Sequence, residues 1–93
     1  MIICAALQIL DVDLDKIVDI IAGVRHPWCY QTYDTLYAER HCIVIEGFLT
    51  DKNEFLNREK AYDHALMCNQ ISPALRQYKK DHDEYMLYSE DLY

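Results

Sequence analysis

The stretch from Glu46 to Glu59 constrains the fold more than any other part of this chain. It leads from a β-branched run, through Gly47 and the turn residues 51–53, into a helical pattern. Asn57 is a strong helix N-cap, because its side-chain oxygen can accept a hydrogen bond from a first-turn N–H. Glu59 then lies in the first turn, where the helix dipole favours negative charge. The sequence therefore predicts that a strand ends, turns and gives way to a helix within this stretch.

Further apolar runs predict the other strands of a sheet. One of them, residues 16–24, fits helical spacing as well as a strand, but its β-branched content and Gly23 near its end favour a strand. Residues 11–15, where aspartates alternate with apolar side chains, predict a turn or an irregular extension of the preceding strand. Three further pieces are predicted to be extended: residues 2–10, 42–48 and, more briefly, 55–56.

Two main helices are predicted to accompany the sheet. Pro27 fits the first turn of a helix that ends near residues 40–41. Its apolar face is expected to consist of Cys29, Tyr33, Leu36 and Tyr37. A second helix covers residues 57–70, and residues 74–85 predict a weaker, polar helix. The last residues, 88–93, form an acidic aromatic tail that we expect to dock on the domain.

Together these elements predict an α+β fold. We expect a small antiparallel sheet of three or four strands, two main helices and a docked C-terminal segment in one ligand-binding domain, residues 1–93. A chain of 93 residues buries only about 60–65% of its unfolded surface, so association with further copies would help to stabilise it.

Charge and composition exclude several classes of function. The net charge of −7 argues against binding to long nucleic acids, which needs a basic stripe. A small anion is still compatible, since one or two arginines can hold a phosphate. No apolar run is long enough to span a bilayer, and residues 1–4 lack the basic lead of a signal peptide. The four cysteines have no paired spacing, so we expect reduced thiols in a cytosolic protein.

Two clusters are candidates for ligand binding. Arg25 and His26 lie between a strand and a helix, where the arginine can hold a phosphate and the histidine can cap or stack. Phe48, Asn57 and Arg58 flank the central turn, where the ring can stack on a base and the amide can bond to a base edge. Taken singly, each residue is also explained by a structural role: solvated arginines, a helix-entry histidine, a core phenylalanine and a capping asparagine.

The residues do not indicate catalysis or a bound metal. Histidines and cysteines never occur at metal-ligand spacing, and no phosphate-binding glycine motif is present. A nucleophilic pair such as Cys29 with His64 has no local support, and acid–base carboxylates cannot be singled out in so acidic a chain. We therefore expect a binding protein that is not an enzyme and uses no cofactor.

Several blocks, in this order, resemble a family of small bacteriophage proteins. The blocks are residues 1–6 (Met-Ile-x-x-Ala-Ala), 23–26 (Gly-x-Arg-His), 46–50 (Glu-Gly-Phe-Leu-Thr), 55–59 (Phe-Leu-Asn-Arg-Glu) and 87–93 (Leu-Tyr-Ser-Glu-Asp-Leu-Tyr). The blocks at 55–59 and 87–93 are the most specific. The family is that of the phage anti-Thoeris sponges. These proteins sequester signals of the cyclic ADP-ribose type, and some relatives bind cyclic oligonucleotides of the CBASS defence system.

The resemblance implies a function in the cytoplasm of the infected host cell. The chain would bind a cyclic nucleotide immune signal without cleaving it, as a homo-oligomer from dimer to hexamer with pockets at subunit junctions. It implies that Arg25, Phe48 and Asn57 line the pocket, with Arg58 and Asp91 as weaker assignments. His26 stands beside Arg25, and Arg40 is the candidate for a second pocket arginine.

The chain also departs from the family's pattern. It is short between Arg25 and Glu46, and Glu54 stands where an arginine is expected, so the identity of the signal is left open. Two other functions are compatible with the residues. One is an enzyme that degrades the same signals, and the other is an acidic protein that inhibits a host defence protein by charge mimicry.

Overall fold

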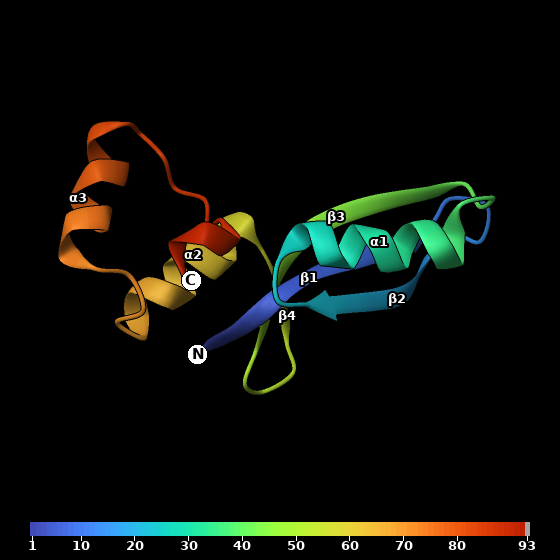
Figure 1. Cartoon of the computed structure of the whole chain (residues 1–93), viewed down its shortest axis with the longest axis horizontal. Coiled ribbons are helices and arrows are strands. Elements are labelled where there is room, and N and C mark those ends of the chain that lie inside the picture. Colours follow the sequence, from blue (N-terminus) through green and yellow to red (C-terminus); the bar gives the residue numbers. More distant parts are fainter. Residues whose placement is uncertain (93) are drawn as a thin grey trace.

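The fold is built on a long central strand, β1, to which the other strands pair in turn. The computed structural model describes residues 1–92 (Figure 1), and Tyr93, the last residue of the predicted tail, lies outside them. Its elements are β1 (Ile2–Asp11), β2 (Lys16–Gly23), α1 (His26–Tyr37), β3 (Cys42–Thr50), β4 (Phe55–Asn57), α2 (Arg58–Met67), α3 (Pro73–Asp81) and a short 3-10 turn, η1 (Ser89–Asp91). The predicted α+β fold is confirmed, with four strands and a third helix.

The sheet has the order β2-β1-β3-β4, and all neighbouring strands are antiparallel. β1 occupies a central position because it is rich in apolar residues, and Ala5, Leu7 and Ile9 are fully buried. Leu7 lies opposite both Glu46 in β3 and Ile21 in β2. Because side chains alternate along a strand, this register sets which residues face α1 and which face the other way.

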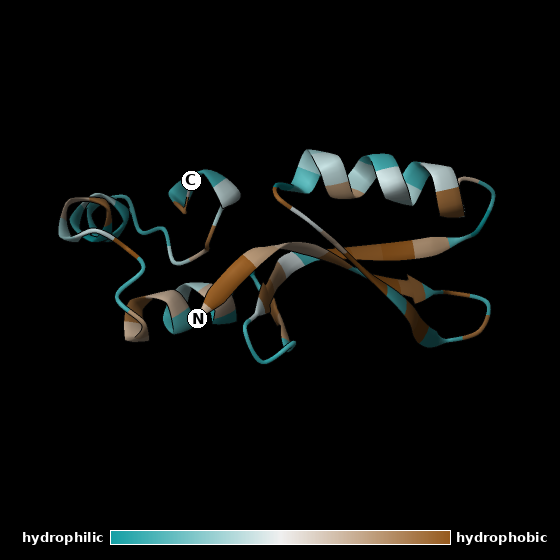
Figure 2. Cartoon of the chain, turned by 60° about the horizontal axis from the view of Figure 1, so that its bottom comes forward, coloured by the Kyte–Doolittle hydropathy of each residue, from teal (hydrophilic) through white to brown (hydrophobic). Residues whose placement is uncertain are grey.

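α1 covers one face of the sheet. Cys29 is fully buried, and the Tyr37 hydroxyl donates to Asp19 of β2 at 2.7 Å. The predicted apolar face is correct for Cys29, Tyr33 and Tyr37 but wrong for Leu36, whose side chain is exposed; Tyr30 packs inward as well. Figure 2 shows the helix on one side of the apolar strands.

The predicted strand–turn–helix unit is confirmed. β3 ends at Thr50, the chain turns back through β4, and Asn57 caps α2 by accepting from the N–H of Lys60 at 2.9 Å. β4 crosses so close to Gly47 that a Cβ there would lie 2.2 Å from the carbonyl oxygen of Leu56. A residue without a side chain is therefore required at this crossing.

Residues 11–15 form a turn. Asp11 ends β1 and its side chain accepts from the N–H of Leu14 at 3.0 Å, while Asp15 has a left-handed φ of 53° that reverses the chain. Asparagine and aspartate tolerate this conformation better than most residues. Of the two predicted alternatives, the turn is therefore the correct one.

The C-terminal part of the chain, with α3 and the tail, forms a separate lobe beside α2. Ser72 caps α3, whose first residue is Pro73. Beyond α3 the tail returns toward the sheet, where Leu87 and Ser89 are buried, so the prediction of a docked tail is confirmed for its described part. The molecule is elongated, 43 × 26 × 21 Å, with α3 at one end and the β1–β2 turn at the other (Figure 1). None of the helices within residues 1–92 has the length and apolar character needed to cross a bilayer.

Candidate functional site

Four segments that lie far apart in the sequence meet where α1 and α2 begin. His26, the first residue of α1, is buried, and its Nε2 lies 2.8 Å from the carbonyl oxygen of Gly47. Its Nδ1 lies 3.3 Å from Oγ of Ser89 in the tail. Since a carbonyl oxygen only accepts, Nε2 donates to Gly47, and Nδ1 of the neutral ring accepts from the serine hydroxyl. Burial lowers the pKa of His26 and outweighs the hydrogen bond to Gly47, so the ring is neutral at pH 7.

Arg58, the first residue of α2, ties the tail to the sheet. Its Nη1 donates to the carbonyl oxygen of Leu87 at 2.8 Å, and the N–H of Leu87 donates back to the Arg58 carbonyl at 2.9 Å. Its Nη2 pairs with Oε2 of Glu46 at 2.5 Å, and the guanidinium lies over the ring of Tyr88, 4.7 Å from its centre. Both terminal nitrogens are thus engaged by protein groups.

Glu46 accepts a second hydrogen bond at its other carboxylate oxygen. The hydroxyl of Tyr30 donates to its Oε1 at 3.0 Å. Burial by itself raises the pKa of Glu46, but the hydrogen bonds from Arg58 and Tyr30 outweigh it, and the pKa is lowered. Burial and the bond to Glu46 raise the pKa of Tyr30 to about 12. At neutral pH the network therefore contains a charged carboxylate, a charged guanidinium and a neutral phenol.

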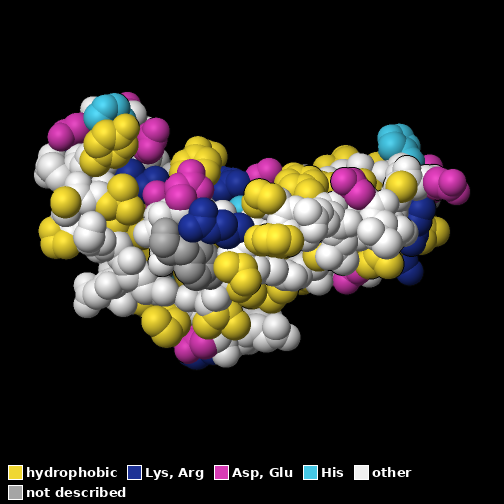
Figure 3. Space-filling view, in the orientation of Figure 1, with side chains coloured by type: hydrophobic (Ala, Val, Ile, Leu, Met, Phe, Trp, Pro, Cys, Tyr) yellow, Lys and Arg dark blue, Asp and Glu magenta, His cyan; other side chains and the backbone are white. Residues whose placement is uncertain are grey.

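A buried lysine joins α3 to the same tail. The side chain of Lys79 is only 2% exposed, and its Nζ lies 2.9 Å from Oδ2 of Asp91 and 3.0 Å from the carbonyl oxygen of Met86. The same oxygen of Asp91 accepts from the N–H of Tyr88 at 2.9 Å. Figure 3 shows Lys and Arg side chains between the α3 lobe and the sheet, with acidic side chains beside them. The tail is thus held by one cation from α2 and one from α3.

The hollow next to Arg58 is poorly suited to an anion. Its volume is about 330 Å³. It is lined by Glu46, Asn57, Arg58, Glu59 and Met86. The lining includes two acidic residues and a single arginine, which is already paired with Glu46. A phosphate here would meet a surplus of negative charge.

The structure brings some of the predicted site residues together. The junction between tail and sheet contains three of them, His26, Arg58 and Asp91. Their side chains form hydrogen bonds or ion pairs with other protein groups at this junction. Phe48 lies beneath them, fully buried, with its ring edge-on to His26 at 5.1 Å between centroids. Its ring has no open face against which a base could stack. Asn57 lies beside Arg58, and its side-chain oxygen is occupied by the helix cap.

The two remaining predicted arginines lie at opposite ends of α1. Arg25 is exposed at the N-cap of α1, directly before His26. Arg40 follows the C-terminal end of α1, where it pairs with Asp11 and lies over the ring of Tyr37 at 5.2 Å. Asp11 is at the Cys42 end of the β1–β3 ladder, whereas the junction is at Gly47, about 17 Å along the strand. Within one chain, Arg40 does not join the others.

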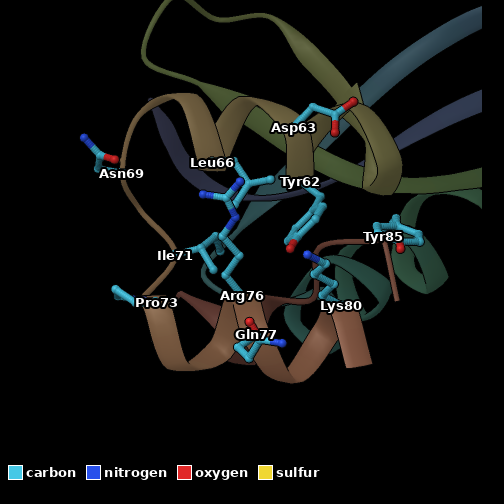
Figure 4. A pocket seen from close by; sticks show the side chains of 10 residues that line it. All are labelled: Tyr62, Asp63, Leu66, Asn69, Ile71, Pro73, Arg76, Gln77, Lys80 and Tyr85. Atoms are coloured by element: carbon cyan, nitrogen blue, oxygen red, sulfur yellow. The ribbon is translucent and has the colours of Figure 1, made fainter. Parts of the chain in front are cut away.

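A larger cavity lies between α2 and α3 and has a different character (Figure 4). Its volume is about 610 Å³, within the range of small-molecule sites. It is lined by Tyr62, Asp63, Leu66, Asn69, Ile71, Pro73, Arg76, Gln77, Lys80 and Tyr85. In Figure 4, Arg76 and Lys80 extend from α3 toward α2, and the ring of Tyr62 points down from α2 between the helices.

The two cations of this cavity have no acidic partner among the residues that the structure describes. Within residues 1–92, neither Arg76 nor Lys80 forms an ion pair. They stand four residues apart on one helix, where like charges repel by a few tenths of a kcal/mol. Asp63, the acidic residue of the lining, points away from them in Figure 4. The cavity thus gathers positive charge in a chain whose net charge is −7.

Comparison with known proteins places the chain in a phage family. A family model described as the phage T4 y16D protein matches residues 1–93. The chain belongs to this family. The bacteriophage part of the resemblance noted above is therefore correct. No curated protein and no solved structure matches the chain.

The sequence of this member of the y16D family does not by itself predict the α2–α3 cavity. The sequence of residues 74–85 predicts a polar helix, but nothing local indicates that Arg76 and Lys80 face α2. The available signal is their spacing of four residues, which places both side chains on one face of a helix. Among residues 1–92, no group of three His, Cys, Asp or Glu side chains is arranged to hold a metal. All four cysteines are free thiols.

Proposed function

We propose that this phage protein binds a compact anionic nucleotide in the α2–α3 cavity and sequesters it without cleaving it. The observation that carries the proposal is the pair of cations, Arg76 and Lys80, facing a cavity with tyrosine rings at its walls. Arginine and lysine are the side chains that bind phosphate groups, and an aromatic ring offers a stacking surface to a base. The cavity volume of about 610 Å³ is sufficient for such a ligand.

Membership of a phage family supports a role during infection. A cyclic nucleotide immune signal, either a cyclic ADP-ribose isomer or a CBASS-type cyclic oligonucleotide, is the ligand that the resemblance implies for the host cytoplasm. Its phosphates would meet Arg76 and Lys80, and its base would lie against the exposed ring of Tyr85. In this proposal the junction at Arg58 holds the tail and α3 in place, so that the cavity exists before the ligand binds. The entropic cost of ordering the protein on binding is then small.

Isothermal titration calorimetry with a panel of cyclic dinucleotides, cyclic trinucleotides and cyclic ADP-ribose isomers tests this proposal. We expect one class to bind with a Kd in the nanomolar range, since a sponge must compete with the effector. Arg76→Gln and Lys80→Gln should each weaken binding by about 10- to 100-fold, because a charge-assisted hydrogen bond contributes about 1.5–3 kcal/mol. The matched control is Lys52→Gln, which removes the same charge from an exposed turn. Absence of binding by any member of the panel to the folded protein would refute the proposal.

The fate of the ligand separates a sponge from an enzyme. Protein saturated with ligand is heated, and the released small molecule is identified by mass spectrometry. We expect the intact ligand. A hydrolysed or linearised product would instead show that the chain degrades the signal.

A second candidate function is favoured by the charge of −7. An acidic phage protein can occupy the basic surface of a host defence protein by mimicking its ligand. A host protein that is retained equally by the original chain and by Arg76→Gln/Lys80→Gln, with no small-molecule binding, would support this function.

A further inference from the structure

Tyr62, at the wall of the α2–α3 cavity, combines a buried side chain with an unused hydroxyl. The residue is only 4% exposed. Within residues 1–92, however, its hydroxyl forms no hydrogen bond. Two tyrosines of α1 that pack onto the sheet donate to carboxylates, Tyr30 to Glu46 and Tyr37 to Asp19. Because a buried tyrosine hydroxyl usually has a partner, the hydroxyl of Tyr62 is free to serve a bound group.

The ring of Tyr62 is held in place by its neighbours. Ala61 and Ala65 of α2 are fully buried, so this part of the helix is packed against the domain. The ammonium of Lys79 lies 5.6 Å from the centre of the ring and is itself anchored by Asp91. The hydroxyl therefore has a defined position before any ligand binds, which keeps the entropic cost of using it small.

The hydroxyl is directed into the space that the two cations enter from the opposite helix. In Figure 4 the oxygen at the tip of Tyr62 points from α2 toward α3, and Arg76 and Lys80 extend from α3 toward α2. Guanidinium and ammonium groups only donate hydrogen bonds, and a phenol hydroxyl has one hydrogen to donate. Three donors therefore face this space, whereas Asp63 of the lining points away from it. The complementary group is one that only accepts, namely an oxyanion.

We infer that Tyr62 is a specificity-determining residue of this cavity, whose hydroxyl donates a third hydrogen bond to the phosphate group that Arg76 and Lys80 bind. The inference rests on the proposed function, since it takes the ligand to be a nucleotide. A terminal phosphate has three free oxygens, one for each donor. A carboxylate has two oxygens in one plane, so it fits donors from two opposite helices less well. The hydroxyl thus selects phosphate among anions, which the two positive charges alone do not.

An adjoining acidic hollow sets the orientation of the ligand. Its volume is about 430 Å³, and it shares Asp63 and Tyr85 with the α2–α3 cavity. It is lined by Glu59, Asp63, Asp83, Tyr85 and Met86. Within residues 1–92, none of its three carboxylates forms an ion pair. These charges repel phosphate toward Tyr62, so the ligand carries its phosphate at one end and turns hydroxyl or amino groups, which donate, toward the carboxylates.

Replacing Tyr62 by phenylalanine tests the hydroxyl, with inorganic phosphate as the probe. A titration followed by phosphorus NMR should show that the original chain binds phosphate and that acetate at equal ionic strength does not displace it. Tyr62→Phe should raise the Kd for phosphate by about 10-fold or more, because a hydrogen bond to a charged group is lost. The matched control is Tyr85→Phe, which removes a hydroxyl that already bonds to Asp83 at 3.1 Å and should change the Kd by no more than about 2-fold.

Stability without phosphate separates this role from a structural one. Tyr62→Phe should unfold in urea at the same midpoint as the original chain, because no hydrogen bond within residues 1–92 is lost. Added phosphate should raise the midpoint of the original chain more than that of Tyr62→Phe. Failure of the folded original chain to bind phosphate, or equal binding by Tyr62→Phe, would overturn the inference.

Two adenine nucleotides test the orientation, and the nucleotide panel separates this inference from the proposed function. Adenosine 5′-diphosphate should bind at least about 10-fold more tightly than adenosine 3′,5′-bisphosphate, whose second phosphate would meet the carboxylates. If it binds no more tightly, the orientation is wrong. A panel nucleotide that binds the original chain and Tyr62→Phe equally would overturn the inference alone. Phosphate binding that depends on Tyr62, with no nucleotide bound, would refute the proposed function alone.

Discussion

Replacing Asp91 by asparagine should destabilise the protein strongly, because it leaves the buried Lys79 ammonium without its main counter-charge. Asparagine has almost the shape of aspartate and keeps an oxygen that can accept from the N–H of Tyr88. What changes is the charge 2.9 Å from Lys79 Nζ, in a place where the lysine side chain is 2% exposed and the aspartate 9%. The substitution thus isolates the cost of an unpaired buried cation.

The magnitude follows from the neighbours that remain. Breaking one partner of a buried ion pair costs about 3–5 kcal/mol. Here the carbonyl oxygen of Met86 stays at 3.0 Å, the carboxylate of Glu84 stays at 3.9 Å, and the rings of Tyr62 and Tyr88 lie 5.6 and 5.1 Å away. These contacts reduce the loss, so we expect about 2–3 kcal/mol. Removing the cation as well, in Lys79→Met/Asp91→Asn, should cost less than Asp91→Asn alone, because no charge is then left without a partner.

Urea unfolding followed by circular dichroism measures these differences. With a slope of about 1 kcal/mol/M for a chain of this size, Asp91→Asn should lower the midpoint by about 2–3 M. Glu84→Gln is the control, since it removes a weaker and more exposed partner and should cost less than about 1 kcal/mol. The reasoning fails if Asp91→Asn changes stability by less than about 0.5 kcal/mol, or if the double variant is less stable than Asp91→Asn.

Three further predictions concern His26 and Cys29 of α1 and Gly47 of β3. Because burial lowers the pKa of His26 in the folded chain, the unfolded chain binds more protons below about pH 6.5, so stability should fall as the pH drops from 7 toward the folded pKa and level off below it. Urea midpoints at pH 7, 6 and 5 should show this dependence, and His26→Gln should reduce it. Gly47→Ala should cost more than about 2 kcal/mol, because its Cβ would lie 2.2 Å from a backbone carbonyl oxygen of β4; an unchanged melting temperature would contradict this. The thiol of Cys29 is fully buried and burial raises its pKa, so it should react with Ellman's reagent only when the chain unfolds, which stopped-flow absorbance can detect.

The elements were predictable where the signal is local. Asn57 caps α2, Pro27 starts α1 and the apolar runs form β1 to β3, since turn chemistry, capping and alternation act over a few residues. Leu36 was misassigned because helical spacing alone does not fix which of two neighbouring apolar stripes turns inward.

The functional residues were less predictable, because their surroundings depend on distant parts of the chain. Sequence indicates that Arg58 begins a helix, but the groups that occupy its guanidinium come from β3 and from the tail. The burial of Lys79 could not be foreseen, since a lysine on a polar helix is ordinarily solvated. Arg76 and Lys80 face a cavity only because the tail holds α3 against α2.

The bonds from His26 to Ser89 and from Lys79 to Asp91 have a consequence for the motions of the molecule. The first spans 63 residues of sequence and the second joins α3 to the same short tail, so α3 cannot swing away from α2 while the tail stays bound to the sheet. Amide hydrogen exchange should therefore report α3 and the tail as a single cooperative unit that opens before β1 and β3 do. A ligand held between α2 and α3 would slow that opening and would be released at the rate at which it occurs.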